Sequence, residues 1–202
     1  MDTIIGKTTL AVRAGLESDK QFGAVIPPVY LTSNFAFKQF GVEQQYDYSR
    51  TANPTRDTLA EAIATLEDGY GATVTSSGMA ALNLVTTFLN PEDYVLIPHD
   101  CYGGTIRLFS KLSERGLLRT VYVNQGDLEA VQQTVNKYNP KMVLVESPSN
   151  PLLRVVDIQA LSKITRGNDA LLVVDNTFLS PIFQTPFKLG ADLVIHSTTK
   201  YI

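Results

Sequence analysis

The fold class follows from residues 142–176, which read MVLVESPSNPLLRVVDIQALSKITRGNDALLVVDN. Two short apolar runs, residues 142–145 and 171–174, lie near the two ends and lack the polar alternation of a half-exposed strand. Between them, residues 158–166 carry apolar side chains at the three- and four-residue spacing of a helix. This strand-helix-strand pattern is typical of parallel strands that are buried on both faces.

The same alternation continues in both directions along the chain. Further apolar runs predict strands at residues 72–75, 94–98, 120–123 and 193–195, and helical spacing predicts helices at residues 79–89, 105–115 and 128–138. We therefore expect an α/β fold, a mostly parallel sheet with helices on both faces.

Residues 1–52 lack this regularity and predict an extended N-terminal arm. Pro27, Pro28 and Gly41 interrupt its short apolar stretches. A helix is then expected to begin at Asn53, which can cap free N–H groups, and to end near Gly69. The sequence thus predicts two parts, the arm (1–52) and a sheet-containing domain (53–202).

The composition is that of a folded chain without a strongly basic surface. The 202 residues are 44% hydrophobic and 18% charged, with a formal net charge of −3. The absence of a Lys/Arg cluster argues against a nucleic-acid or membrane surface, so small molecules and other proteins are the expected partners. The single cysteine, the lack of a signal peptide and the lack of an apolar run of ~18 residues predict a cytoplasmic location.

Polar residues follow the predicted strands, at the edge where parallel sheets bind ligands. They are residues 76–78, 99–104, 146–150, 175–177 and 197–200. Two histidines without metal-ligand spacing predict no metal site, and Cys101 is expected to serve packing rather than catalysis.

Three of these segments contain residues that could bind a ligand or react, and each residue could instead have a purely structural role. Ser77 and Gly78 lie where a strand turns into a helix, which suits a phosphate but also an ordinary tight turn. Asp175 ends an apolar strand, where its carboxylate needs a cation or the hydrogen bonds of a turn or helix cap. Lys200 could be a neutral amine in a partly desolvated pocket, or a solvated surface lysine.

Together, these three features match what holds pyridoxal 5′-phosphate (PLP): a phosphate cradle, an aspartate for the pyridine nitrogen and an imine-forming lysine. Tyr102 could stack on its ring, and Asn150 could hydrogen-bond its phenolic oxygen. Neither a GxGxxG nor a GxxxxGK[ST] motif occurs, which disfavours NAD and ATP.

Six segments also resemble those of a known family. They read YDYSRTANPTRD (46–57), SSGMAA (76–81), PHDCYGGTIRLF (98–109), VESPSNPLLRVVDI (145–158), VVDNTFLSP (173–181) and HSTTKY (196–201). In this order and at these intervals, they are similar to the PLP-dependent enzymes of cysteine and methionine metabolism. The resemblance implies the large domain of an aspartate-aminotransferase-like (type I) PLP-dependent transferase.

The resemblance also implies roles for individual residues. Lys200 resembles the family's imine-forming lysine, Asp175 the partner of the pyridine nitrogen, and Tyr102 the residue that stacks on the ring and assists proton transfers. Asn150 matches a residue near the phenolic oxygen. The positions that resemble the phosphate site are Ser77, Gly78, Met79, Ser197 and Thr199, joined from the neighbouring subunit by Tyr48 and Arg50.

The reaction implied is a γ-replacement in methionine biosynthesis, in which an O-acyl-L-homoserine, expected to be O-succinyl, and L-cysteine give L-cystathionine. The HDCYGGTIRLF segment favours it over a γ-lyase or an O-acylhomoserine sulfhydrylase. The resemblance implies a homodimer or homotetramer. It covers only the family's N-terminal part, without its C-terminal domain, so a truncated, non-catalytic chain that at most binds PLP or a subunit is a further alternative.

Overall fold

The structure, a computed structural model, describes residues 6–202. They divide into two compact units, the first ending at Val74 and the second running from Thr75 to Ile202. The sequence places a boundary at residues 52–53, whereas residues 53–74 belong with the first unit. The reason is that the helix after the arm bonds to the arm itself, for example through Thr55 Oγ1, which accepts from Tyr30 N at 2.9 Å. Residues 1–5 of the predicted arm lie outside the described residues.

The first unit contains two helices among its described residues, α1 (Lys7–Arg13) and α2 (Pro54–Glu67). The helix α1 corrects the expectation of a wholly irregular arm. At the start of α2, Asn53 caps as predicted, because its side chain accepts from Thr55 N at 2.9 Å. The helix ends at Glu67, and its C-cap, Asp68, has a φ of 58° in the left-handed region, one residue before Gly69.

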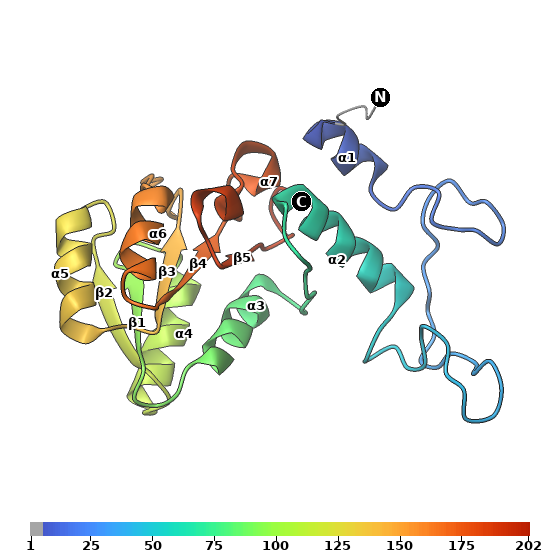
Figure 1. Ribbon diagram of the computed structural model, residues 1–202, viewed down its shortest axis with the longest axis horizontal. Helices are drawn as coiled ribbons and strands as arrows, with labels where there is room; N and C mark the ends of the chain where they lie inside the picture. The colour runs from blue at the N-terminus through green and yellow to red at the C-terminus, as the bar shows by residue number, and fades with distance from the viewer. Residues whose placement is uncertain (1–5) are drawn as a thin grey trace. The chain divides into compact units, whose positions relative to one another are not determined.

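The second unit is built on the predicted parallel sheet (Figure 1). The strands are β1 (Tyr94–Pro98), β2 (Arg119–Val123), β3 (Met142–Glu146), β4 (Leu171–Asp175) and β5 (Leu193–Ile195), in the order β2-β1-β3-β4-β5. All neighbouring pairs are parallel. The prediction of these five strands is confirmed to within one residue at each end.

A predicted strand at residues 72–75 is wrong. The segment has no regular structure, and it pairs with no strand in the part of the chain that the structure describes. An isolated extended segment gains no ladder hydrogen bonds, so apolar composition alone does not make it a strand.

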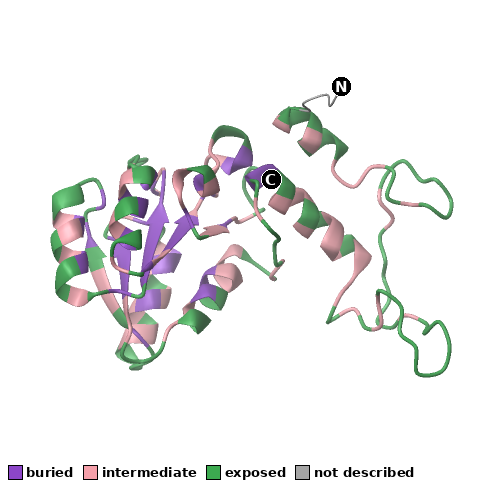
Figure 2. Ribbon diagram, viewed as in Figure 1, coloured by how far each residue is buried: buried purple, intermediate pink, exposed green. Residues whose placement is uncertain are grey.

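Helices cover both faces of the sheet, as predicted. They are α3 (Gly78–Val85), α4 (Gly103–Glu114), α5 (Leu128–Tyr138), α6 (Ile158–Arg166) and α7 (Ser180–Phe183), with the 3₁₀ turns η1 (Thr86–Phe88) and η2 (Pro186–Leu189). Leu82 of α3 and Phe109 of α4 pack on one face, whereas Val131 of α5 and Leu161 of α6 pack on the other. Figure 2 shows the resulting concentration of buried residues on the central strands.

The sheet changes direction between β1 and β3. The chain leaves β1 through α4 on one face to reach β2, then returns through α5 on the other face to β3, on the far side of β1. A crevice opens beyond the carboxyl ends of the strands at such a switch point, and ligands of α/β sheets bind there.

Two observations on residues 6–202 concern other kinds of site. No group of three His, Cys, Asp or Glu side chains within them could hold a metal ion. None of their helices is both long enough and apolar enough to cross a membrane.

Candidate active site

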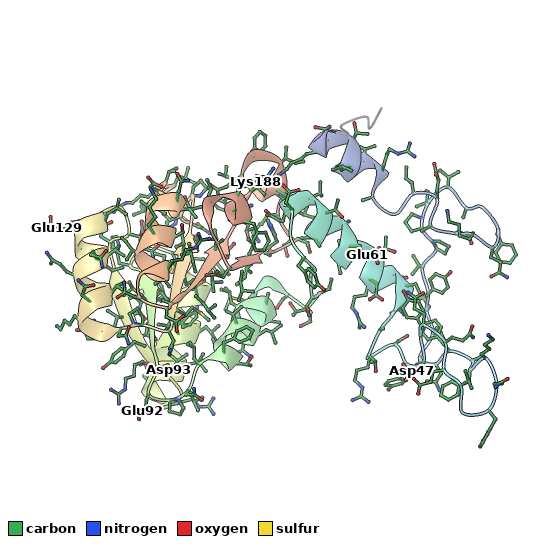
Figure 3. The ribbon with its side chains drawn as sticks, in the orientation of Figure 1. Asp47, Glu61, Glu92, Asp93, Glu129 and Lys188 are labelled. Atoms are coloured by element: carbon green, nitrogen blue, oxygen red, sulfur yellow. The ribbon has the colours of Figure 1, made fainter. Side chains whose placement is uncertain are left out.

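A cavity of about 230 Å³ lies where the carboxyl ends of the strands meet the start of α3, and every residue lining it belongs to the second unit. The lining residues that the sequence predicts are Ser77, Gly78, Met79, Tyr102, Asn150, Asp175, Ser197, Thr199 and Lys200. The others are Leu82, Glu146, Pro148, Thr177 and Phe178. Glu92 and Asp93, labelled in Figure 3, mark the opposite, amino end of β1.

The start of α3 forms one wall of the cavity. Ser77 caps the helix, with its side-chain oxygen accepting from Ala80 N at 3.1 Å. The first N–H groups of a helix have no partner within the helix, so those of Gly78 and Met79 are available to an anion. A Cβ on Gly78 would lie 2.7 Å from Cβ of Ser197, so only glycine lets α3 and the turn after β5 come this close. The start of α3 and the turn after β5 therefore line the same part of the cavity.

Asp175 lies at the end of β4, directly beside the end of β3. Burial raises the pKa of its carboxyl, while the hydrogen bond from Thr177 N at 3.0 Å and the nearby His196 act in the opposite direction. The carboxylate of Asp175 therefore has the hydrogen bond of a turn, which the sequence offered as one alternative, because Thr177 N donates to one of its oxygens. A desolvated carboxylate that lines a cavity also favours a cationic or protonated nitrogen in its ligand.

Lys200 lines the cavity but is exposed, as are the two residues before it. Its backbone N donates to Ser197 O at 3.3 Å, which holds it in the turn after β5. Of the two alternatives for this lysine, the described residues leave it exposed, because β5 lies at the edge of their sheet and they do not cover it. Its role as the imine-forming lysine stays a prediction.

Tyr102 is the N-cap residue of α4, in the turn after β1, and lines the cavity. A Cβ on Gly104 would lie 2.4 Å from Cε1 of Tyr102 and 2.9 Å from Sδ of Met79, so this glycine leaves room for both side chains. The backbone N of Tyr102 donates to Glu146 Oε2 at 2.9 Å.

The turn after β3 brings Asn150 to the same cavity. Its backbone N donates to Glu146 Oε1 at 2.6 Å. Asp100 Oδ2 accepts from Ser149 Oγ at 3.1 Å and lies 3.3 Å from Nε of Arg154. These bonds tie the turn after β3 to the turn after β1.

Tyr48 and Arg50 belong to the first unit and do not line this cavity. They contact each other, with the Arg50 guanidinium carbon 5.1 Å from the centre of the Tyr48 ring. Their predicted role in a neighbouring subunit's phosphate site stays a prediction.

Thr177 and Phe178 are two of the lining residues to which the sequence argument gave no role. Thr177 Oγ1 accepts from Ser197 N at 2.9 Å and so joins the turns after β4 and β5. Phe178 packs edge-on against Tyr201, with ring centres 6.3 Å apart. Their position directly after a buried strand is the signal that could have identified them.

Comparison with known proteins finds a family that matches most of the chain. The family model described as Cys/Met metabolism PLP-dependent enzyme matches residues 8–202. The chain is 53% identical to the cystathionine gamma-synthase of Escherichia coli over 197 residues and 40% identical to the cystathionine gamma-lyase of Bacillus subtilis over 196 residues. Each match covers 97% of this chain, but 51% and 52% of the relative.

A solved structure shows the same fold. The crystal structure of cystathionine gamma synthase from Xanthomonas oryzae pv. oryzae in complex with aminoacrylate and cysteine has a TM-score of 0.95 and 48% sequence identity to this chain. The similarity covers 98% of this chain and 51% of that one. The chain thus spans about half the length of the curated relatives that it matches.

Proposed function

The chain belongs to the Cys/Met metabolism PLP-dependent enzymes, and on that basis we propose that the whole protein joins O-succinyl-L-homoserine to L-cysteine by γ-replacement, giving L-cystathionine. The observation that carries this choice is the higher identity to a cystathionine gamma-synthase than to a cystathionine gamma-lyase over nearly the same residues. A cytoplasmic location stays a prediction.

The cavity residues fit PLP. The start of α3 and the turn after β5 would hold the phosphate, Asp175 would face the pyridine nitrogen, and Tyr102 would lie against the ring. Asn150 would hydrogen-bond the phenolic oxygen, and Lys200 would bond to the aldehyde carbon. The phosphate set is Ser77, Gly78, Met79, Ser197 and Thr199.

When bound, PLP supplies an electron sink for the charge left behind when a proton departs from the substrate. The chain's own residues then hold and move protons. Asp175 would keep a proton on the pyridine nitrogen. The Nζ of Lys200 would accept the proton from Cα of the substrate, and the Tyr102 hydroxyl would assist proton transfer to the leaving group.

The first unit would act in a homodimer or homotetramer, with Tyr48 and Arg50 completing the phosphate site of another copy. It exposes large apolar side chains, including Phe22, Leu31 and Phe40, which are 83%, 94% and 104% exposed. Such a surface is typical of an interface. Light scattering of the wild type and of Phe40→Ser tests this, and an unchanged mass contradicts this part of the proposal.

The second candidate is a γ-lyase, which the match to the Bacillus subtilis enzyme favours. An O-acylhomoserine sulfhydrylase uses the same cofactor residues. The product distinguishes the three enzymes. A synthase adds cysteine at Cγ, a sulfhydrylase adds sulfide there, and a lyase adds no thiol and releases 2-oxobutanoate.

Cofactor binding is tested first on the 202-residue chain. The chain is mixed with PLP, reduced with borohydride and digested, and the pyridoxyl adduct is located by mass spectrometry. We expect the adduct on Lys200, lost in Lys200→Ala and kept in Lys163→Ala, a variant of an exposed lysine on α6. A folded chain without this adduct contradicts the proposed cofactor site.

The reaction is tested next in a chimera that joins this chain to the C-terminal half of the Escherichia coli relative. Supplied with O-succinyl-L-homoserine and L-cysteine, the chimera is expected to form L-cystathionine. 2-Oxobutanoate as the main product would identify a lyase. A folded chimera that binds PLP but forms neither product would favour the non-catalytic alternative.

A further inference from the structure

The carboxylate of Glu146 divides its two oxygens between two separate turns. Oε2 accepts from Tyr102 N at 2.9 Å, in the turn after β1, and Oε1 accepts from Asn150 N at 2.6 Å, in the turn after β3. The residue is 8% exposed, so water competes little for either bond. Hydrogen bonds to a charged acceptor are about twice as strong as neutral ones.

These bonds connect the turns after β1 and β3, where the hydrogen-bond ladder between the two strands has already ended. Between β3 and β4 the ladder runs the full length, from Met142 and Leu171 to Glu146 and Asp175. Between β1 and β3 the register comprises only Val95 with Met142 and Leu96 with Val143, and it ends before the carboxyl end of either strand.

Side chains take over where this ladder stops. Gln125, in the turn after β2, donates from Nε2 to Leu144 O at 2.7 Å and so occupies a carbonyl near the end of β3. Beyond it, Glu146 connects β3 to the start of α4. The relative position of the two turns at the crevice therefore depends on Glu146 and on the bonds of Asp100.

Asp100 and Glu146 hold different parts of these turns. Asp100 bonds to the side chains of Ser149 and Arg154, whereas Glu146 bonds to the backbone of the two residues that line the cavity. A buried carboxylate beside Asp175 is costly to ionise, and burial raises its pKa to about 7. Its two backbone N–H donors are what stabilise the charge.

We propose that Glu146 is a positioning residue of the active site, whose carboxylate fixes Tyr102 and Asn150 relative to each other across the crevice so that both meet the cofactor at once. This inference rests on the proposed function, because it assigns to Tyr102 and Asn150 the ring and the phenolic oxygen of PLP. Glu146 itself acts through their backbone.

The decisive variant is Glu146→Gln. An amide of the same shape has one acceptor oxygen, and its NH₂ group would face the other backbone N–H, so one of the two bonds is lost. Glu129→Gln, on the exposed surface of α5, is the matched control for an acid-to-amide change.

Three measurements on the 202-residue chain decide the proposal. Hydrogen exchange of the cofactor-free chain is expected to speed up in residues 100–104 and at Ser149 and Asn150 of Glu146→Gln, and to stay unchanged in the strands. PLP affinity is expected to fall about tenfold, the effect of losing one charge-assisted bond. The absorption and circular dichroism of the bound cofactor are expected to change, because the ring contacts shift.

The outcomes separate this proposal from the proposed function. Faster exchange with unchanged cofactor affinity and spectrum would make Glu146 only a structural brace, and unchanged exchange would show that it does not hold these turns. Either result overturns the proposal. A wild-type chain that gives no Lys200 adduct overturns the proposed function and this inference together, whereas an adduct in the wild type leaves the Glu146→Gln result to decide this inference alone.

Discussion

Gly78 and Ser197 lie so close together that a single methyl group cannot fit between them. The hypothetical Cβ of Gly78 would be 2.7 Å from Cβ and 3.1 Å from Oγ of Ser197. Because Gly78 begins α3 and Ser197 follows β5, the two halves of the proposed phosphate site are in direct contact. Their separation sets the size of the site.

Gly78→Ala is expected to weaken PLP binding by about tenfold or more, since overpacking at a rigid contact costs about 1–3 kcal/mol. The methyl group would push the start of α3 away from the turn after β5. Ser197→Ala in the same chain should not restore affinity, because the clash involves Cβ. Equilibrium titration followed by absorbance measures the effect.

The control for this prediction is Gly71→Ala, where a Cβ would meet nothing within 4 Å. It should leave PLP affinity unchanged. Equal affinity in Gly78→Ala and the wild type would show that the phosphate does not depend on this contact.

The stability of the fold is expected to depend on pH through Glu146. Its pKa is raised from 4.5 to about 7 by burial, against the two backbone N–H bonds, with Asp175 and Asp100 adding to the rise. An acid whose pKa rises on folding contributes stability that is fully present below its unfolded pKa and is lost as pH increases through its folded pKa.

The free energy of unfolding of the wild type, relative to Glu146→Gln, should therefore decrease by about 3 kcal/mol between pH 4.5 and pH 8. Urea unfolding at several pH values measures the difference. The free energy of unfolding of Glu129→Gln should show the same pH dependence as that of the wild type. A constant difference between the wild type and Glu146→Gln would show that Glu146 does not titrate in this range.

Cys101 is expected to react very slowly in the folded chain. It is 3% exposed, and burial raises its pKa to about 12, with Glu146 adding to the effect. Iodoacetamide alkylation at pH 8 should be about a thousandfold slower than in urea, because the thiolate is the reactive form. Comparable rates in the two conditions would mean that the turn after β1 opens readily.

Asn53 joins the arm to α2 and is expected to stabilise the first unit. Its oxygen caps Thr55 N at 2.9 Å, and its Nδ2 donates to Ser49 Oγ at 3.0 Å and Tyr30 O at 3.2 Å. Asn53→Ala should cost about 1–2 kcal/mol of unfolding free energy. Asn53→Asp keeps the cap but loses both donors, so its stability should fall between those of the wild type and Asn53→Ala. Urea unfolding followed by helical circular dichroism checks the order.

The fold and most of the cavity could be predicted because each parallel strand occurs in the sequence as a separate apolar run. The polar residues that follow β1, β3, β4 and β5 line the cavity, so the sequence alone places Asp175 and Lys200 at the same end of the sheet. Ser77 reaches the cavity as the N-cap of α3 and not as the end of a strand. The run at residues 72–75 failed because strand formation depends on a partner, which composition does not report.

Long-range relationships could not be predicted. The bond between Glu146 and Tyr102 joins residues 44 positions apart, and it depends on which strands become neighbours. The exposure of Lys200 likewise depends on β5 lying at the edge of the described sheet. The helix α1 escaped prediction because its sequence, KTTLAVR, is too short for a helical repeat to stand out.

The short strand β5 has a consequence for inactivation. Three residues, paired only with β4 in the described chain, deliver Ser197, Thr199 and Lys200 to the cavity. A short edge strand opens at a lower free energy than the strands beside it. Brief detachment of β5 would separate Lys200 from Asp175 while the rest of the sheet stays folded, so warming should abolish cofactor capture before the chain melts.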